Sequence, residues 1–285
     1  MRRADRVATQ EWPRTSRIDA THVLERIADI TGVRLELEGA APGGEVGAAY
    51  VRWPDGRRSV LTEGRSRTGP LVDKARAAGV PTARQELAAH VDGARVIVQQ
   101  RLPGHPPQVV DAALVGQMIA VNDRLAGLLA TEPNPRPADL HLTADGPGFC
   151  LHEPLRQHSD RTARLLDRVH AIGETHPAML GDDLVHLDFH PGNVLVVGGH
   201  LTGVIDWDGA TRGDRHFDLV TLRFMLTGQD PCAVRLLDER LEAISERRRR
   251  AYWAHMSLRL VDWSIRHHDD ATVDHWLDVA ESGLS

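Results

Sequence analysis

The chain has 285 residues, of which 41 % are hydrophobic and 26 % charged, the ordinary balance of a globular protein that buries a core. The formal net charge of −6 argues against nucleic acid and anionic membranes as partners, and no apolar run approaches the roughly 18 residues that span a bilayer. Cys150 and Cys232 form neither a disulfide framework nor a zinc site, and the first residues lack the apolar stretch of a secretory signal, so we expect a cytoplasmic protein.

The first third of the chain carries mostly strand signals. A helical apolar spacing ends before Gly32, and the pattern then alternates as in a half-buried strand. Pro54-Asp55-Gly56 and Asp92-Gly93 are typical hairpin turns. The expected elements are a helix at 18–30, strands at 33–38, 48–53 and 57–62, a helix at 71–78, and strands at 85–89 and 95–100.

Helical spacing replaces the strand signals after residue 101. The expected helices cover residues 109–129, 159–175, 217–226, 233–246, 251–267 and 272–280, with a short strand pair at 194–197 and 203–205. A β-rich first third followed by an α-rich remainder indicates an α+β chain of two lobes. We predict an N-terminal nucleotide-binding lobe over residues 1–102 and a C-terminal helical lobe over residues 103–285 with the catalytic loop and the acceptor site.

Three oxygen-bearing side chains stand out in the segment 183–208. Asp188 lies on a loop, Asn193 follows five residues later, and Asp206 ends the next strand-like piece. Phosphoryl transfer needs a carboxylate that orients the acceptor hydroxyl and hard oxygen ligands that hold Mg²⁺ on the phosphates. This set offers one base and two metal ligands.

The runs His186-Leu-Asp188-Phe-His190-Pro-Gly-Asn193, Ile205-Asp206-Trp-Asp208 and Gly213-Asp214-x-x-x-Asp218-Leu219 resemble the aminoglycoside phosphotransferase and choline kinase-like family. The resemblance implies a bilobal protein-kinase-like fold and transfer of phosphate from ATP or GTP, with Mg²⁺, to an alcohol group of a small molecule. It implies Asp188 as the catalytic base, Asn193 and Asp206 as Mg²⁺ ligands, and His186 as a residue that orients the loop. Asp218 would brace the loop from a following helix.

The N-terminal lobe departs from the usual kinase pattern. The third strand normally carries a lysine that reaches the phosphates, but the expected position falls near Thr62, and Lys74 is the only lysine of the chain. Arg58 and Arg65 are alternative phosphate contacts, since an arginine also neutralises phosphate. The remaining candidates for nucleotide binding are Gly47, at the end of a small-residue stretch, and the hinge-like residues Gln99, Gln100 and Arg101.

Other interpretations of the same residues remain open. His186, Asp188 and His190 are spaced two residues apart, so in a strand they would share one face and could bind a transition metal. Pro191-Gly192, however, breaks a strand at that point. A nucleotide-binding pseudokinase with a regulatory role would also explain the missing lysine.

The acceptor is the least determined part of the prediction. Candidate lining residues lie between Arg223 and Trp276 and comprise the aromatic residues Trp253, Trp263 and Trp276 and the acidic group Asp262, Asp269, Asp270 and Asp274. The acidic group would suit a polycationic aminoglycoside. We expect an antibiotic of the aminoglycoside, nucleoside or peptide type as the acceptor, so that the activity confers resistance, with a hydroxylated metabolite such as an amino alcohol or sugar as the alternative.

Overall fold

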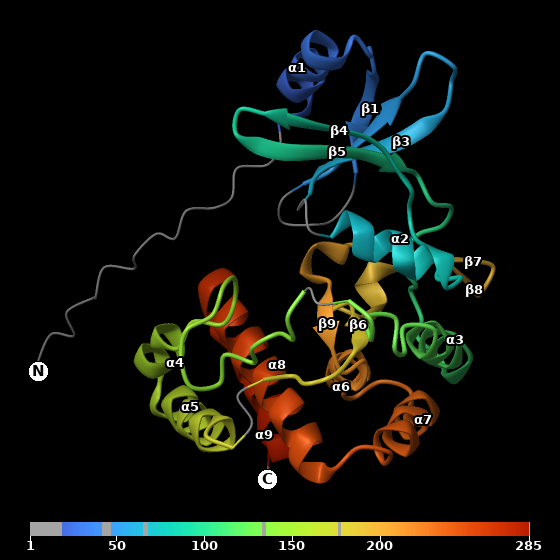
Figure 1. Ribbon diagram of the computed structural model, residues 1–285. Coiled ribbons are helices and arrows are strands. Elements are labelled where there is room, and N and C mark those ends of the chain that lie inside the picture. Colours follow the sequence, from blue (N-terminus) through green and yellow to red (C-terminus); the bar gives the residue numbers. More distant parts are fainter. Residues whose placement is uncertain (1–18, 42–46, 65–67, 133–134, 176–177, 285) are drawn as a thin grey trace, which may run out of the picture.

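The computed structural model describes residues 19–41, 47–64, 68–132, 135–175 and 178–284. Figure 1 shows a sheet-rich N-terminal part above a helical C-terminal part. This arrangement confirms the α+β class that the sequence predicts. Among the described residues, no helix combines the length and the apolar character needed to cross a membrane.

The N-terminal part is an antiparallel sheet of five described strands in the order β1-β2-β3-β5-β4. The strands are β1 (Glu36–Ala40), β2 (Ala49–Arg52), β3 (Arg58–Glu63), β4 (Gln85–Val91) and β5 (Ala94–Gln100). Both predicted hairpin turns are present, with positive φ at Gly56, Asp92 and Gly93.

Helix α1 (Ala20–Thr31) covers one face of this sheet (Figure 1). Asp19 accepts a hydrogen bond from the backbone N–H of His22 and starts the helix, and Gly32 ends it in the left-handed conformation. Buried side chains of α1 pack with alternate residues of the strands, such as Val51, Leu61 and Val98, in a small core. The opposite face of the sheet therefore carries the residues in between.

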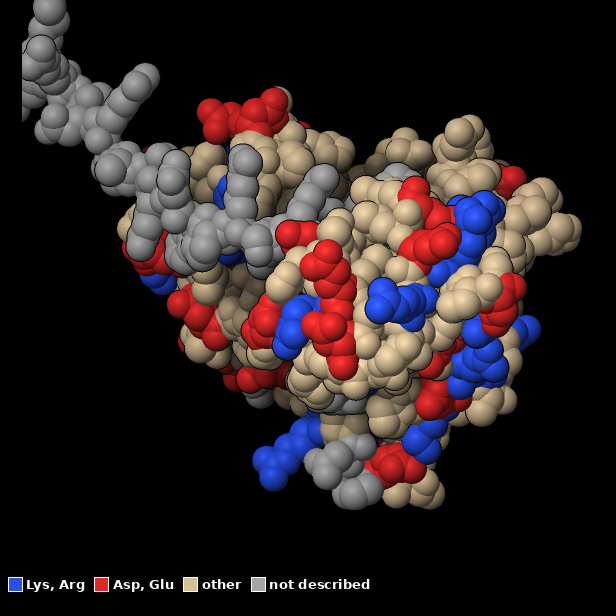
Figure 2. Space-filling view, turned by 90° about the horizontal axis from the view of Figure 1, so that it is seen from above, with Lys and Arg blue, Asp and Glu red and all other residues tan. Residues whose placement is uncertain are grey.

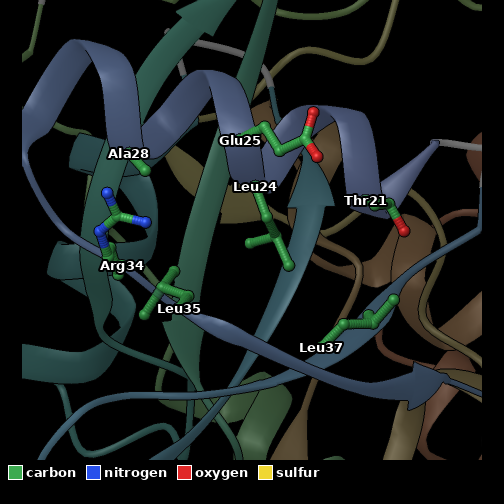
Figure 3. Close-up of a pocket in the computed structure, with 7 residues that line it drawn as sticks. All are labelled: Thr21, Leu24, Glu25, Ala28, Arg34, Leu35 and Leu37. Carbon is green, nitrogen blue, oxygen red and sulfur yellow. The ribbon is translucent and has the colours of Figure 1, made fainter.

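A shallow pocket of about 240 Å³ lies between α1 and the segment that leads into β1. Figure 3 shows that Leu24 from the helix and Leu35 and Leu37 from the opposite segment line it. All of its lining residues belong to the N-terminal part, so this pocket is separate from the three motifs of residues 186–219.

The helical part holds the larger core. Its helices are α3 (Ala112–Asp123), α4 (Glu153–His158), α5 (Asp160–Gly173), α6 (His216–Met225), α7 (Pro231–Leu241), α8 (Glu246–His267) and α9 (Asp270–Leu284). Two small antiparallel pairs, β6 (Asp183–Val185) with β9 (Thr211–Gly213) and β7 (Val194–Val197) with β8 (His200–Val204), lie among them. On the face seen in Figure 2, acidic and basic side chains are interspersed.

Helix α2 (Gly69–Ala77) lies between the sheet and the helical part (Figure 1). Its buried residues Leu71 and Ala75 belong to the larger core rather than to the core beneath the sheet. The backbone N–H of Val204 also donates to the oxygen of Pro81, just beyond the helix, at 2.7 Å. By packing, α2 therefore belongs with the C-terminal part, although it falls within the predicted lobe 1–102.

Several boundaries differ from the sequence prediction because tertiary contacts decide them. The helix expected at 109–129 begins after the cap Asp111 and ends at Asp123, where turns with positive φ at Gly127 follow. Helix α4 and the three-residue strands β6 and β9 were not expected, since so few residues give no readable period. The first strand is shifted and contains a bulge between Leu37 and Gly39.

Gly104 joins the two parts at a point where no side chain fits. Its φ is +106°, and a Cβ atom there would lie 2.6 Å from the backbone oxygen of Val196. The neighbouring residues bind the same hairpin: Thr202 Oγ1 donates to the oxygen of Pro103 at 2.7 Å. The linker thus docks on β7–β8, next to the motifs.

We predict that Gly104→Ala lowers the free energy of unfolding by about 1–3 kcal/mol, because strained φ and a backbone clash both oppose an L side chain there. Denaturant unfolding measures the change. Gly116→Ala is the matched control: in α3 the nearest atom to the added Cβ is a side-chain carbon at 3.9 Å, so this change should be neutral or stabilising. Equal stability of both variants would contradict the prediction.

Candidate active site

In the loop from β6 to β7, two hydrogen bonds join Asn193 to Asp188. Asn193 Nδ2 donates to the backbone oxygen of Asp188 at 2.9 Å and to its carboxylate Oδ2 at 3.1 Å. Because the amide nitrogen is turned toward Asp188, the amide oxygen of Asn193 points to the other side. The Asp188 side chain remains 28 % exposed, so a substrate can reach it.

Asp206 joins these residues through the β7–β8 hairpin. Val194 pairs with Val204, and the N–H of Ile205 donates to the backbone oxygen of Asn193 at 3.0 Å. Asp206 follows directly with φ +61°, a conformation that a non-glycine residue adopts at some cost. The hairpin therefore brings the backbone directly before Asp206 to Asn193, thirteen residues earlier in the sequence.

His186 is fully buried beneath the loop. Its Nε2 donates to the oxygen of Ile205 at 2.9 Å, which leaves Nδ1 to accept the N–H of Asp188 at 3.3 Å. Burial lowers the pKa of His186 to about 4, so the ring is neutral near pH 7. These contacts connect the loop to the end of β8 and give His186 an orienting position.

Asp218, near the start of α6, holds the same loop from below. Its two carboxylate oxygens accept the consecutive backbone N–H groups of His186, at 2.8 Å, and Leu187, at 3.0 Å. Leu187 has φ +69°, so these bonds hold a strained residue directly before Asp188. Burial raises the pKa of Asp218 to about 7, against the opposing effect of the two N–H donors.

The carboxylates of the site differ in their electrostatics. Burial acts to raise the pKa of Asp188, but the His190 ring and the Arg259 guanidinium outweigh burial and hold this pKa below its usual range. For Asp206, burial raises the pKa and the negative charges of Asp188 and Asp208 raise it further. Asp188 is thus ionised, whereas the negative charge of Asp206 is not fully balanced by nearby positive charge.

This donor set suits a hard divalent cation. The amide oxygen of Asn193 and the carboxylate of Asp206 are oxygen ligands, and Mg²⁺ is commonly bound through few protein oxygens while water and phosphates complete its shell. The raised pKa of Asp206 is what a site for positive charge is expected to have before the cation binds. The residues therefore fit Mg²⁺.

The alternative site for a transition metal does not form. Both ring nitrogens of His186 are engaged in hydrogen bonds, and its ring is buried. Within the described part of the chain, no three His, Cys, Asp or Glu side chains are grouped so that they could hold a metal ion. The interpretation of His186, Asp188 and His190 as ligands of one metal is wrong, because the loop turns at His190 instead of continuing as a strand.

One residue at this site has no counterpart in the sequence prediction. Arg259 of α8 donates from one guanidinium nitrogen to the backbone oxygen of Leu187 at 2.8 Å and from another to Asp188 Oδ1 at 3.0 Å. An arginine on a helix 71 residues further along the chain resembles any solvated basic residue in sequence. No sequence signal could have found it.

The predicted basic phosphate contacts are spread over the N-terminal half. Arg58 donates to Glu38 and lies at the end of β3 that pairs with Arg52, whereas Gly47 lies beyond the opposite end of the same strand pair. Lys74 forms an ion pair with Glu132 at 2.9 Å. Arg65 lies outside the described residues. The structure thus does not bring Arg58 and Lys74 together at Gly47, and their roles stay predictions.

The hinge-like residues lie at the edge of the sheet face that α1 leaves uncovered. Gln99 pairs with Val60, which pairs with Tyr50, so the three side chains share this face. The guanidinium of Arg101 lies over the Tyr50 ring at 4.0 Å from its centroid. Gln100 donates its N–H to the oxygen of Arg84 and is exposed. The roles of Gln99, Gln100 and Arg101 in nucleotide binding stay predictions.

Two of the three candidate acceptor tryptophans are packing residues. Trp253 is buried and donates from Nε1 to the oxygen of Ala280, and Trp276 stacks on Phe224 with ring centroids 5.7 Å apart. Trp263 is half-buried and follows Arg259 by one helical turn, so both lie on one side of α8. Its ring lies against those of His267 and His268, and its role in acceptor binding stays a prediction.

The acidic group divides between the core and the surface. Asp262 is buried with an ion pair to Arg266, and Asp269 accepts hydrogen bonds from Thr272 at the start of α9. Asp274 pairs with Arg161 at 3.4 Å, and Asp270 is highly exposed, with His158 3.9 Å away. Asp262 and Asp269 thus serve helix packing and a helix start, whereas Asp270 and Asp274 are mostly exposed, and the role of the group in binding a polycation stays a prediction.

The chain matches the model of the phosphotransferase enzyme family over residues 70–253, whereas no curated protein matches it in sequence. Its fold is similar to that of a thermostable mutant of aminoglycoside phosphotransferase APH(4)-Ia in ternary complex with ADP and hygromycin B. The TM-score is 0.63 at 18 % identity, over 92 % of this chain and 97 % of that chain.

Two further solved structures have the same fold. An aminoglycoside-3'-phosphotransferase of type VIII aligns with a TM-score of 0.55 and 21 % identity, over 83 % of this chain and 98 % of that chain. A macrolide 2'-phosphotransferase from Brachybacterium faecium aligns with a TM-score of 0.54 and 17 % identity, over 92 % of this chain and 97 % of that chain. At these identities the likeness establishes the kinase-like fold and nothing about the acceptor.

The family match spans more than half of the chain and includes the loop at 186–193, Asp206 and Asp218. It confirms the resemblance drawn from the order of the three motifs. The chain belongs to the phosphotransferase enzyme family, the small-molecule phosphotransferases with a kinase-like fold.

Proposed function

We propose that this protein moves the γ-phosphoryl group of ATP or GTP to a hydroxyl of a small-molecule antibiotic and so inactivates it. The observation that carries the proposal is the convergence of Asp188, Asn193 and Asp206, held by two backbone-to-carboxylate bonds from below and by the β7–β8 hairpin from the side. The family match supports the reaction class.

In the proposed reaction, the acceptor hydroxyl donates a hydrogen bond to the carboxylate of Asp188, which fixes the attacking oxygen in line with the γ-phosphorus. The new O–P bond forms as the bond between the γ-phosphorus and its bridging oxygen breaks, and the hydroxyl proton passes to Asp188 late. A carboxylate with a low pKa suffices because the transition state is loose and needs positioning more than a strong base. Bound Mg²⁺ would supply neutralisation of phosphate charge, held by Asn193 and Asp206.

A nucleotide-binding pseudokinase remains the second candidate, and the observation that favours it is Thr62 on β3, where a kinase normally carries lysine. The retained Asp188, Asn193 and Asp206 argue against it, since a pseudokinase has no use for the metal ligands and the base together. A kinase of a hydroxylated metabolite would use the same site and differ only in its acceptor.

The test is nucleoside diphosphate release from ATP and from GTP with a panel of hydroxylated acceptors: nucleoside and peptide antibiotics, aminoglycosides, amino alcohols and sugars. We expect acceptor-dependent release, and Asp188→Asn should lower kcat by about 10²–10⁴-fold, or about 3–5 kcal/mol, because the base loses its charge. Asp167→Asn, at an exposed position of α5, is the control and should keep the rate.

The panel separates the candidate functions. An unchanged rate in Asp188→Asn would remove the base from the mechanism. Nucleotide binding without a phosphorylated product from any acceptor would favour the pseudokinase, and products from sugars or amino alcohols alone would favour a metabolite kinase.

Asp206→Ala tests the metal site independently of the acceptor. The variant should lose Mg²⁺-dependent turnover, and Mg²⁺ should no longer strengthen ATP binding in calorimetry, because one of the two protein oxygens that hold the cation is gone. Circular dichroism checks that the variant folds. If Mg²⁺ still strengthens ATP binding as in the parent protein, Asp206 is not a ligand.

A further inference from the structure

Arg259 of α8 forms hydrogen bonds with the catalytic loop. This residue is 25 % exposed in its side chain and donates to two acceptors in consecutive residues, the backbone oxygen of Leu187 and Oδ1 of Asp188. Other arginines of α8 bind elsewhere: Arg248 pairs with Asp214, and Arg266 with Asp262. Arg259 is thus committed to the loop rather than to the packing of the helices.

We propose that Arg259 is a positioning residue of the phosphoryl transfer, which fixes the backbone before the base and the rotation of the base carboxylate at the same time. The inference rests on the proposed function and adds to it a residue on a different element. The two hydrogen bonds of Arg259 correspond to these two tasks.

The first task concerns the backbone of Leu187. A leucine with φ +69° is strained by roughly 1–2 kcal/mol relative to an ordinary conformation. Its N–H is held by Asp218 from α6 and its C=O by Arg259 from α8. The peptide groups on both sides of the strained residue are therefore tied to two separate helices, and loss of either tie lets the loop relax away from the geometry that presents Asp188.

The second task concerns the carboxylate of Asp188. Arg259 binds Oδ1, and Asn193 donates to Oδ2. With each oxygen held by a different donor, the carboxylate cannot rotate about its Cβ–Cγ bond without breaking a charge-assisted hydrogen bond. The acceptor hydroxyl then meets an oxygen in one orientation, which is the requirement for in-line attack.

Both tasks require an arginine rather than any cation. The guanidinium is planar and presents several N–H groups in a fixed fork, so it spans an oxygen of Leu187 and one of Asp188 at once, whereas a lysine ammonium is a point donor. A merely stabilising ion pair would be different: a partly exposed pair is worth at most about 1 kcal/mol, and either cation serves. A positioning role and a merely stabilising ion pair therefore make opposite predictions for Arg259→Lys and for rescue of Arg259→Ala by added guanidinium.

We expect Arg259→Gln and Arg259→Ala to lower kcat by about 10–100-fold, the effect of a misplaced reacting group, with the KM for nucleotide unchanged because Asn193 and Asp206 remain. Arg259→Lys should stay at least about tenfold below the parent kcat. Added guanidinium should restore part of the kcat of Arg259→Ala, whereas ammonium at the same concentration should not. Arg247→Ala is the control, an exposed arginine of the same helix that also donates to a backbone oxygen, and it should keep the parent kcat.

A second measurement needs neither nucleotide nor acceptor. Hydrogen–deuterium exchange of the ligand-free protein should be faster for the loop amides 186–193 in Arg259→Gln than in the parent and in Arg247→Ala, with the amides of α6 and α8 unchanged. If the parent protein phosphorylates no acceptor, the proposed function fails while this measurement still decides the role of Arg259. Unchanged loop exchange, or full kcat in Arg259→Lys, would overturn the proposal.

Discussion

The buried carboxylate of Asp218 is the constraint on which the site depends. It sits at the start of α6 and accepts the N–H groups of His186 and Leu187, two consecutive donors that no strand or helix would otherwise use. Burying this carboxyl group is costly, as its raised pKa indicates, and the two N–H donors offset part of that cost. Because the strained Leu187 is anchored in this way, the next residue, Asp188, projects from a fixed point of the helical core.

The other parts of the site meet at this fixed point from different directions. The β7–β8 hairpin bonds Ile205, the residue before Asp206, to the backbone of Asn193. His186 donates to the oxygen of the same Ile205 and so connects the hairpin to the loop. Helix α8 adds Arg259 from the opposite side. Asp188, Asn193 and Asp206 lie on loops. The elements that orient them are buried helices and a short hairpin, so these side chains are held by a rigid core.

The N-terminal part has a different role in this arrangement. Its sheet is covered by α1 on one face and leaves Tyr50, Val60 and Gln99 on the other, with Arg101 over the Tyr50 ring. No lysine stands on β3, and the one lysine of the chain binds Glu132 instead. Under the proposed function, phosphate recognition would rest in part on Asn193 and Asp206 of the helical part.

The sequence by itself determined the elements and motifs whose signals are local. Turn residues such as Asp92-Gly93 fix hairpins within a few positions, and Asp188, Asn193 and Asp206 follow each other at a spacing that one loop and one hairpin can close. Only the tertiary structure decided which distant side chains meet: Arg259 on Asp188, α2 in the C-terminal core, and Asp262 on Arg266 instead of an acceptor. The physical reason is that helical periodicity specifies a buried face but not the neighbour that buries it, and ion pairing depends on distances that sequence separation does not contain.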